Sequence, residues 1–217
     1  MKQPVFITGI GTGVGKTLVS AIVANALQAD YWKPVQAGYA DGTDSEWVKS
    51  VLPGEHCTIH KETYKLQLPA SPHIAARQEG IRIQLEKISD AYRHIRENLL
   101  TDKKPLVIEG AGGLMVPLNE NDFVADLVKK LSAKLIIVSR NYLGSINHSL
   151  LTAAVCRKYN IDVMGWIFND QFMHYEEEIV EWSGYPKIGS IPFSNNPGND
   201  FIAQQGRLLI PSIKNLL

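Results

Sequence analysis

Four glycines fall within seven positions near the start of the chain, directly before a lysine and a threonine. They form the stretch TGIGTGVGKT, in which Gly9, Gly11, Gly13 and Gly15 precede Lys16 and Thr17. Glycines let the backbone curl so that its N–H groups point inward at an anion. The spacing predicts a phosphate-binding loop in which Lys16 reaches the β- and γ-phosphates of a nucleotide and the Thr17 hydroxyl binds Mg²⁺.

The sequence around this loop supports the prediction, although the spacing departs from the usual motif. That motif has four residues between its outer glycines, whereas five residues separate Gly9 from Gly15. An apolar run, VFI, precedes the loop, and a helical pattern follows it over residues 17–28. A strand before and a helix after are the context that identifies a P-loop. The alternative is a glycine-rich turn with an incidental Gly-Lys-Thr.

A second lysine could share the chemistry of the loop. Lys33 precedes Pro34, and a proline holds the preceding residue extended. Apolar neighbours make an exposed position less favourable for it, although most lysines are solvated surface charges. Beside a P-loop, the Lys33 ammonium could stabilise a substrate anion as well as the γ-phosphate.

Two carboxylates could complete a magnesium site. Asp44 could cap a helix or bind Mg²⁺, and the two roles are compatible. Glu109 ends an apolar run and is followed by a glycine-rich turn. A buried carboxylate is costly unless it is paired or bound to metal. Thr17, Asp44 and Glu109 therefore form the predicted Mg²⁺ ligands, together with phosphate oxygens. The alternative for Glu109 is a simple ion pair.

Short apolar runs and helical patterns alternate along the chain. Strands are expected at residues 5–9, 105–110, 134–140, 163–169 and 187–192, with a further strand end in YWKPVQAG at 31–38. Helices are expected at residues 17–28, 44–52 and 85–100, from Ser71-Pro72, and from Ser145 to 159. This alternation predicts an α/β fold, a P-loop NTPase-like and mostly parallel sheet with helices on both faces. Without a visible linker or repeat, residues 1–217 are expected to form a single domain.

The expected sheet gathers the candidate residues. Gly9, Lys33, Glu109 and Asn169 each fall at the end of an expected strand. Ligands of parallel α/β sheets bind at the carboxyl ends of the strands. We therefore expect these residues along one edge of the sheet.

Composition argues against several classes of protein. Lys+Arg and Asp+Glu both total 22, so the formal net charge is zero, which argues against a general nucleic-acid or membrane-surface binder. There is no apolar run of membrane-spanning length and no recognisable signal peptide. Cys57 and Cys156 lack CxxC spacing, which fits a reducing compartment and a cytoplasmic location.

Taken together, the motifs resemble the dethiobiotin synthase family. The matching segments, in order, are GIGTGVGKT, KPVQAG, the Asp of GTDSEWV, SPHIAA, EGAGGLMVPL, LGSINHSLLTA, GWIFND and IPF, over residues 5–194. The resemblance implies that 7,8-diaminopelargonic acid, CO₂ and ATP give dethiobiotin, ADP and phosphate in biotin biosynthesis. A carbamate and then a carbamic-phosphoric anhydride would be the intermediates.

The resemblance also assigns residues. Lys16 and Lys33 would flank the carbamate and the transferring phosphoryl group as catalytic residues, and Asn169 and Asp170 would meet the adenine. The implied ATP contacts are Gly13, Val14, Gly15, Lys16, Thr17, Leu18, Asp44, Glu109, Gly110, Ala111, Gly112, Asn169, Asp170, Pro192, Phe193 and Ser194. The implied contacts of the diamine substrate are Thr12, Lys33, Ala37, Gly144, Ser145 and Asn147.

The family resemblance further implies a homodimer in which LGSINH, residues 143–148, reaches the site of the facing subunit. Free N–H groups at a helix start suit the substrate carboxylate. Three features depart from the family pattern. Gly11 and Gly13 stand where many members have acidic or polar residues, Ala37 stands where a Ser or Thr is common, and residues 50–70 match poorly.

Other P-loop proteins fit less well. A GTP-binding switch protein would need a guanine-reading NKxD segment, and a partitioning-type ATPase would need a lysine early in the loop; neither is present. A P-loop kinase of a small metabolite is the main alternative, since it explains the P-loop and the Mg²⁺ ligands. It leaves Lys33 and the EGAGG and INH segments without a role. An ATP-binding module without catalysis would leave both lysines without a chemical task.

Overall fold

A single parallel sheet organises the chain. The computed structural model describes residues 3–52, 57–98, 104–170 and 173–216. Seven strands pair in the order β4-β2-β6-β1-β7-β8-β9, and every pair is parallel. These strands are β1 (Val5–Gly9), β2 (Asp30–Trp32), β4 (Ile59–His60), β6 (Leu106–Glu109), β7 (Lys134–Arg140), β8 (Val163–Asn169) and β9 (Lys187–Ile191). The expected α/β class with a parallel sheet is confirmed.

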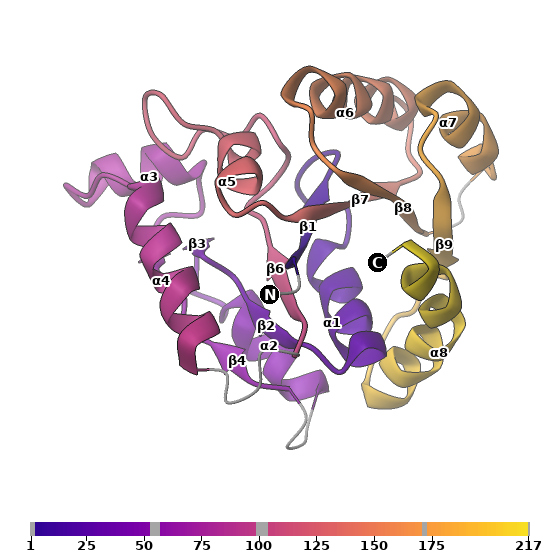
Figure 1. Cartoon of the computed structure of the whole chain (residues 1–217), viewed down its shortest axis with the longest axis horizontal. Coiled ribbons are helices and arrows are strands. Elements are labelled where there is room, and N and C mark those ends of the chain that lie inside the picture. Colours follow the sequence, from indigo (N-terminus) through magenta and orange to yellow (C-terminus); the bar gives the residue numbers. More distant parts are fainter. Residues whose placement is uncertain (1–2, 53–56, 99–103, 171–172, 217) are drawn as a thin grey trace.

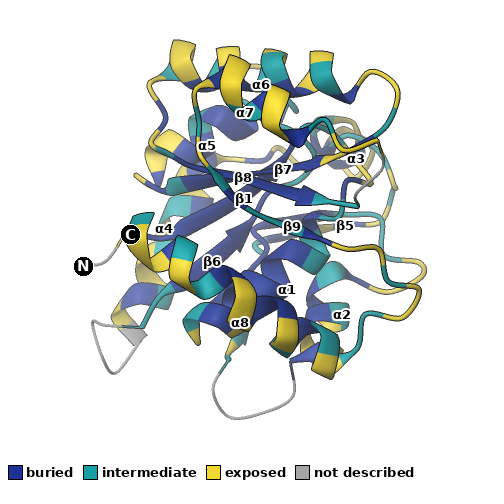
Figure 2. Ribbon diagram, turned by 90° about the vertical axis from the view of Figure 1, so that its right-hand side faces the viewer, coloured by how far each residue is buried: buried dark blue, intermediate teal, exposed yellow. Residues whose placement is uncertain are grey.

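Helices cover both faces of this sheet (Figures 1 and 2). One face carries α1 (Lys16–Leu27), α2 (Asp44–Val51) and α8 (Asn199–Leu216). The other carries α3 (Pro72–Gln78), α4 (Leu85–Asn98), α5 (Val124–Lys130), α6 (Ser145–Tyr159) and α7 (Glu176–Ser183). Figure 2 shows the buried strands between these two layers. The described helices offer no stretch long and apolar enough to cross a membrane.

Strand side chains alternate between the two layers, as the pleat requires. In β1, Phe6 joins the core beneath α4, α5 and α6, whereas Val5 and Ile7 join the core beneath α1. Because both faces are covered, the strands are apolar runs rather than alternating apolar and polar positions. That is why they could be recognised from the sequence.

The segment YWKPVQAG, predicted as the end of a strand, contributes to two strands. Strand β2 ends at Trp32, and β3 (Val35–Ala37) begins after Lys33-Pro34 and pairs with β5 (Tyr64–Leu66) in a separate two-stranded sheet. Proline has no N–H to donate to the main sheet, so the chain leaves that sheet at this point. Lys33 therefore lies between the two sheets.

Most other predicted elements occur at or near their expected positions. Helix α2 has a different cap, because Thr43 rather than Asp44 or Ser45 is its N-cap. Gly144 rather than Ser145 occupies the N-cap position of α6. The end of the predicted helix 85–100 lies outside the described residues. Strands β4 and β5 and helices α5, α7 and α8 were not predicted. The extent of one domain over residues 1–217 stays a prediction.

Candidate active site

The glycine-rich loop runs from the end of β1 to the start of α1. Gly9 ends β1, and Lys16 begins the helix after Gly15, whose φ of 92° is a left-handed conformation that favours glycine. A Cβ atom at Gly15 would also collide with the side chain of Asn169. The helix therefore presents its free N–H groups towards the loop, as a phosphate site requires.

Lys16 is held against this loop. Its Nζ atom donates a hydrogen bond to the carbonyl oxygen of Gly11 at 2.9 Å, and the residue is only 8% exposed. Burial lowers the pKa of Lys16 to about 8, and the nearby positive charge of Lys33 acts in the same direction, against the charges of Glu109 and Asp44. A bound phosphate would supply the counter-charge that the Gly11 carbonyl cannot.

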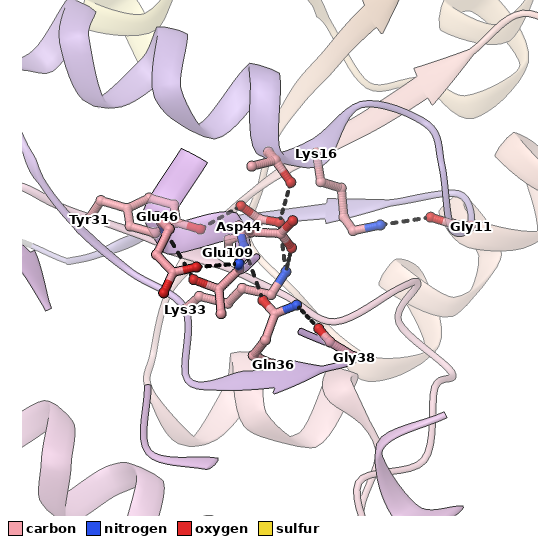
Figure 3. A network of polar contacts seen from close by, with 11 residues as sticks. Gly11, Lys16, Tyr31, Lys33, Gln36, Gly38, Asp44, Glu46 and Glu109 are labelled. Carbon is pink, nitrogen blue, oxygen red and sulfur yellow. Dashed lines mark hydrogen bonds and ion pairs between the residues drawn. The ribbon is translucent and has the colours of Figure 1, made fainter. Parts of the chain in front are cut away.

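Lys33 lies at the centre of the polar network in Figure 3. Its Nζ atom donates to Asp44 and, at 2.8 Å, to Oε1 of Glu109. Burial opposes the charged form of Lys33, but the negative charges of Glu109 and Asp44 and their hydrogen bonds outweigh it and raise the pKa. Lys33 is therefore a buried, charged group beside the P-loop.

The Asp44 carboxylate is free to pair with Lys33 because Thr43, not Asp44, caps helix α2. The Thr43 side chain accepts a hydrogen bond from the Glu46 N–H at 3.1 Å, and the Glu46 carboxylate accepts one from the Thr43 N–H at 2.7 Å. This is a capping box. The Asp44 carboxylate is thereby left to pair with Lys33.

Glu109 receives three hydrogen bonds. Oε1 accepts from the Thr17 hydroxyl at 2.9 Å and from Lys33, and Oε2 accepts from the Tyr31 hydroxyl at 2.7 Å. Burial and the charge of Glu109 raise the pKa of Tyr31 well above its ordinary value, so the phenol remains a donor. Tyr31 was not predicted as a site residue, because nothing local in YWKP links it to a residue 78 positions away.

A cavity of about 740 Å³ opens beside these groups. Its lining includes eleven of the predicted site residues, namely Thr12, Gly13, Gly15, Lys16, Thr17, Lys33, Ala37, Asp44, Glu109, Ala111 and Gly112. The wall also contains residues that were not predicted, namely Val35, Gln36, Pro69, Ala70, Ser71, Pro72 and Val116. Pro69 and Ala70 belong to the segment 50–70, to which the sequence assigned no role.

Several predicted contacts lie around rather than in this cavity. Val14 and Leu18 belong to the loop and to α1, and Gly110 packs so tightly that a Cβ atom there would lie 2.6 Å from Phe6. The Nδ2 atom of Asn169 donates to the Val14 carbonyl at 3.0 Å, so its amide braces the P-loop in this structure.

The residues predicted to meet the adenine gather at the ends of two neighbouring strands. Asn169 ends β8 and pairs in register with Ile191, the last residue of β9. The Asp170 N–H donates to the Ile191 carbonyl at 2.9 Å. Pro192, Phe193 and Ser194 follow directly, and the side chain of Phe193 is 64% exposed. An exposed aromatic ring and a side-chain amide that follow or end neighbouring strands are suited to contact with a planar base.

The segment predicted to face a partner subunit lies on the surface at the start of α6. Gly144 and Asn147 are exposed, but Ser145 is fully buried, and its hydroxyl lies 2.6 Å from the Tyr175 hydroxyl. None of the three lines the 740 Å³ cavity. Within the described part of one chain, the structure does not bring them to the P-loop.

The donor set fits a magnesium ion. Thr17, Asp44 and Glu109 supply hydroxyl and carboxylate oxygens, which Mg²⁺ prefers. The two carboxylates already bind a cation, the ammonium of Lys33, and the Thr17 hydroxyl donates to one of them. Among the described residues there is no group of three or more His, Cys, Asp or Glu side chains that could hold a metal. Phosphate oxygens and water would therefore have to complete the coordination.

Comparison with known proteins agrees with the family resemblance of the sequence motifs. The AAA domain family matches residues 3–199. The ATP-dependent dethiobiotin synthetase BioD of Cytophaga hutchinsonii is 50% identical over 181 residues, which cover 83% of this chain and 84% of that protein. The protein of the same name from Christiangramia forsetii is 45% identical over 188 residues, with 87% and 86% covered.

Solved structures with a similar fold are more distant in sequence. In the MinC:MinD cell division protein complex of Aquifex aeolicus, the matching chain has a TM-score of 0.62 and 16% identity, with 99% of this chain and 95% of that chain covered. A ParA family ATPase from Chlorobium tepidum has a TM-score of 0.58 and 15% identity, with 98% and 96% covered. At these identities the likeness shows the fold alone.

Proposed function

Since this chain belongs to the family of ATP-dependent dethiobiotin synthetases, we propose that it closes the ureido ring of dethiobiotin in the cavity beside Lys16 and Lys33. The chain is an ATP-dependent ligase of biotin biosynthesis. Its substrates besides ATP are 7,8-diaminopelargonic acid and CO₂. A kinase of a small metabolite is not favoured by the relatives.

One observation carries the assignment of the site. The two buried lysines of the P-loop region border the same cavity as Thr17, Asp44 and Glu109. A kinase needs one cation to stabilise the transferring phosphoryl group, whereas ring closure must also hold the carbamate anion that accepts it. Lys33, beside Lys16, supplies the second positive charge at the place where that anion would lie.

The chemistry has three steps. One amine of the substrate attacks CO₂, forms an N–C bond and releases a proton, which leaves a carbamate. A carbamate oxygen then attacks the γ-phosphorus of ATP, and the bond from that phosphorus to ADP breaks. The second amine attacks the carbonyl carbon of this anhydride, the C–O bond breaks with loss of phosphate, and a proton leaves the new ring nitrogen.

The residues contribute mainly by position and charge. Lys16 and the α1 N-terminus bind the β- and γ-phosphates, and Lys33 orients the carbamate towards the γ-phosphorus. Thr17, Asp44 and Glu109 would hold Mg²⁺, which supplies neutralisation of the phosphate charge when bound. The anhydride would have to be shielded from water, which would otherwise hydrolyse it.

The far wall of the cavity suits the hydrocarbon part of the substrate. Val35, Ala37, Pro69, Ala70 and Val116 present apolar groups there. Ala37 has no hydroxyl to offer the substrate, and the neighbouring Gln36 amide already donates to the Gly38 carbonyl at 2.7 Å. Recognition on this side therefore relies on apolar contact, on main-chain groups and on the Ser71 hydroxyl in the same lining.

The nucleotide base and the subunit partner complete the proposal. Asn169 and Asp170 read the adenine edge, and Pro192, Phe193 and Ser194 line its other side. The active form is a homodimer, in which Gly144, Ser145 and Asn147 approach the substrate of the facing subunit. An apolar groove beside α6, lined by Met115, Leu151 and Val155 among others, supports an interface on this face. The protein acts in the cytoplasm.

A mass-resolved assay tests the reaction. Purified protein is incubated with ATP, Mg²⁺, bicarbonate and 7,8-diaminopelargonic acid, and each component is omitted in turn. We expect a product heavier than the diamine by CO₂ minus water, formed with ADP only when all components are present. A phosphorylated product without ring closure would instead establish the kinase alternative.

A further inference from the structure

The ammonium of Lys33 lies between carboxylate oxygen atoms from two elements (Figure 3). Its Nζ atom donates to Asp44 of α2 and, at 2.8 Å, to Oε1 of Glu109 at the end of β6. The same Oε1 atom accepts the hydroxyl hydrogen of Thr17 from α1 at 2.9 Å. Asp44, Glu109 and Thr17 are the residues proposed above to hold Mg²⁺, so the ammonium and the metal need the same two carboxylates.

Charge balance makes simultaneous occupancy unfavourable. Lys33 is 5% exposed and Glu109 is 1% exposed, so little water screens the charges between them. Asp44 and Glu109 carry two negative charges, and a divalent cation neutralises both. An ammonium left at the same oxygens would be a buried positive charge in contact with that cation. Once the metal is present, the two carboxylates no longer hold the ammonium.

The cavity beside Lys33 can receive its ammonium group once that group leaves the carboxylates. Lys33 lines the 740 Å³ cavity together with Lys16, Thr12 and Ala111. An ammonium released from Asp44 and Glu109 would carry its charge into this space, where an anion could pair with it. Lys33 is therefore unavailable to a substrate anion while it is paired with the carboxylates, and available once they are occupied.

We propose that Lys33 holds the place of the divalent cation in the nucleotide-free protein and turns into the cavity when the metal replaces it. The inference rests on the proposed function, because it uses the same metal ligands and the same carbamate. It adds an order of events: the metal binds first, and Lys33 then accepts the substrate anion. Lys33 is thereby a positioning switch as well as a catalytic residue.

Removing the ammonium should open the metal site. In nucleotide-free protein, Lys33→Met keeps an unbranched side chain without the charge, and Mn²⁺ serves as the probe in a paramagnetic resonance titration. We expect Lys33→Met to bind Mn²⁺ at least about tenfold more tightly than wild type, the usual size of a coupling between two ligands. Adding Glu109→Gln to this variant should abolish the gain.

Lys187 offers a matched control. Its Nζ atom also lies between two carboxylates, 2.7 Å from Glu176 and 2.7 Å from Glu177, far along the chain on β9. Lys187→Met removes the same charge from the protein, and we expect its Mn²⁺ affinity to equal that of wild type. An unchanged affinity in Lys33→Met, or equal gains in both variants, would overturn the proposal.

A second measurement needs no substitution and therefore does not depend on whether the variants fold. Wild-type protein is labelled with an amine-reactive ester with and without Mg²⁺, and each modified lysine is quantified by peptide mass spectrometry. We expect Mg²⁺ to increase the labelling rate of Lys33 several-fold and to leave Lys187 unchanged. A constant rate at Lys33 contradicts the proposal. Both measurements omit ATP and the diamine, so their failure is distinguishable from failure of the ring-closure assay.

Discussion

At the scale of single residues, Glu109 organises the candidate site. It is nearly fully buried, and it accepts hydrogen bonds from Thr17 in α1, from Tyr31 in β2 and from Lys33 directly after β2. A buried carboxylate is stable only when its oxygens are satisfied in this way. Of these partners, Tyr31 uses Oε2 and leaves Oε1 to the groups nearest the cavity, so it fixes the rotation of the carboxylate.

The first prediction concerns this orienting contact. Tyr31→Phe removes a hydrogen bond to a charged group, which contributes about 1.5–3 kcal/mol, and leaves Oε2 without that donor. We expect the Mg²⁺ concentration for half-maximal activity to rise about tenfold, because 1.4 kcal/mol corresponds to a factor of ten. Tyr92→Phe in α4 is the control. An Mg²⁺ titration identical to wild type would show that Tyr31 has no orienting role.

The second prediction concerns the missing hydroxyl at Ala37. Ala37→Ser places a hydroxyl on the wall of the cavity, where it can donate to the substrate. We expect the KM for 7,8-diaminopelargonic acid to fall several-fold with little change in kcat, measured by the mass-resolved assay. Ala70→Ser, on another part of the same wall, should leave the KM unchanged. An equal effect at both positions, or a large loss at Ala37, would contradict the proposed substrate position.

At the scale of secondary-structure elements, polar contacts join β4, β2 and β6 on one side of the sheet. Asp30 begins β2 and is fully buried. Its carboxylate accepts a hydrogen bond from the Thr58 N–H at 2.8 Å, pairs with Lys104 just before β6, and lies 3.4 Å from His60 of β4. It therefore connects three neighbouring strands at the end of the sheet opposite to the cavity.

The third prediction follows from the ionisation of Asp30. Burial opposes its charged form, but the contacts with His60, Lys104 and Thr58 outweigh it and lower the pKa from 3.8 to about 2. Since the folded-state pKa lies below the unfolded one, the stabilisation is complete above about pH 4 and is lost as the pH falls towards 2. Asp30→Asn should therefore reduce the free energy of unfolding by about 2 kcal/mol at pH 7.

Urea unfolding over a pH series measures this effect. The difference between wild type and Asp30→Asn should shrink steadily below pH 4. Asp90→Asn, which breaks an exposed ion pair with Arg93 in α4, should change stability by less than about 1 kcal/mol at any pH. A difference for Asp30→Asn that stays constant down to pH 2 would show that its charge does not cause the stabilisation.

The sequence predicted the elements whose signals are local. The P-loop, Lys33 and the long apolar strands could be recognised because glycine spacing, a proline and covered strands leave clear patterns. Helix α8 could not, because Gly206 and Pro211 both disfavour helix. Gly206 faces α1 so closely that a Cβ atom would lie 3.0 Å from the Asn25 side chain. Packing between the two helices, rather than propensity, stabilises α8.

Contacts between distant segments limited the prediction of the site. Tyr31 and the cavity wall at Pro69 and Ala70 belong to the site only because strands and loops meet in space. Strand β5 has three residues, which is too short to show a period. The sequence allows Asp44 to be a helix cap, but a capping box between Thr43 and Glu46 performs that task.

At the scale of the whole molecule, the apolar surface beside α6 is the feature that a single chain leaves unexplained. A groove of about 560 Å³ runs between residues 113–116 and α6, and the side chain of Leu151 on its rim is 58% exposed. The neighbouring Leu143 is fully exposed. In the proposed homodimer, a symmetric contact buries each such residue twice.

The fourth prediction tests this surface. Leu151→Glu places two charges into a symmetric interface, and burying a leucine side chain contributes about 1.5–3 kcal/mol per copy. We expect sedimentation velocity to show a dimer for wild type and a monomer for Leu151→Glu at the same protein concentration. Leu208→Glu changes an equally exposed leucine of α8 (66%) and should remain dimeric. A dimeric Leu151→Glu variant would place the interface elsewhere.

The chain passes from the main sheet to the small sheet at Lys33-Pro34. The lining of the cavity therefore comes from two separate sheets. Lys33 follows directly on β2 of the main sheet, which also carries Glu109, whereas Val35, Gln36 and Ala37 belong to the small sheet with β5. Apart from the side chain of Gln36, which accepts a hydrogen bond from the Asp44 N–H at 3.4 Å, the hydrogen bonds of Lys33 and Glu109 do not involve the small sheet. This division is largely modular: substitutions in β5, at residues 69–72 and at positions of β3 other than Gln36 can reshape the substrate range while the phosphoryl-transfer apparatus is retained. Selection or design for other diamines would act on that small sheet first.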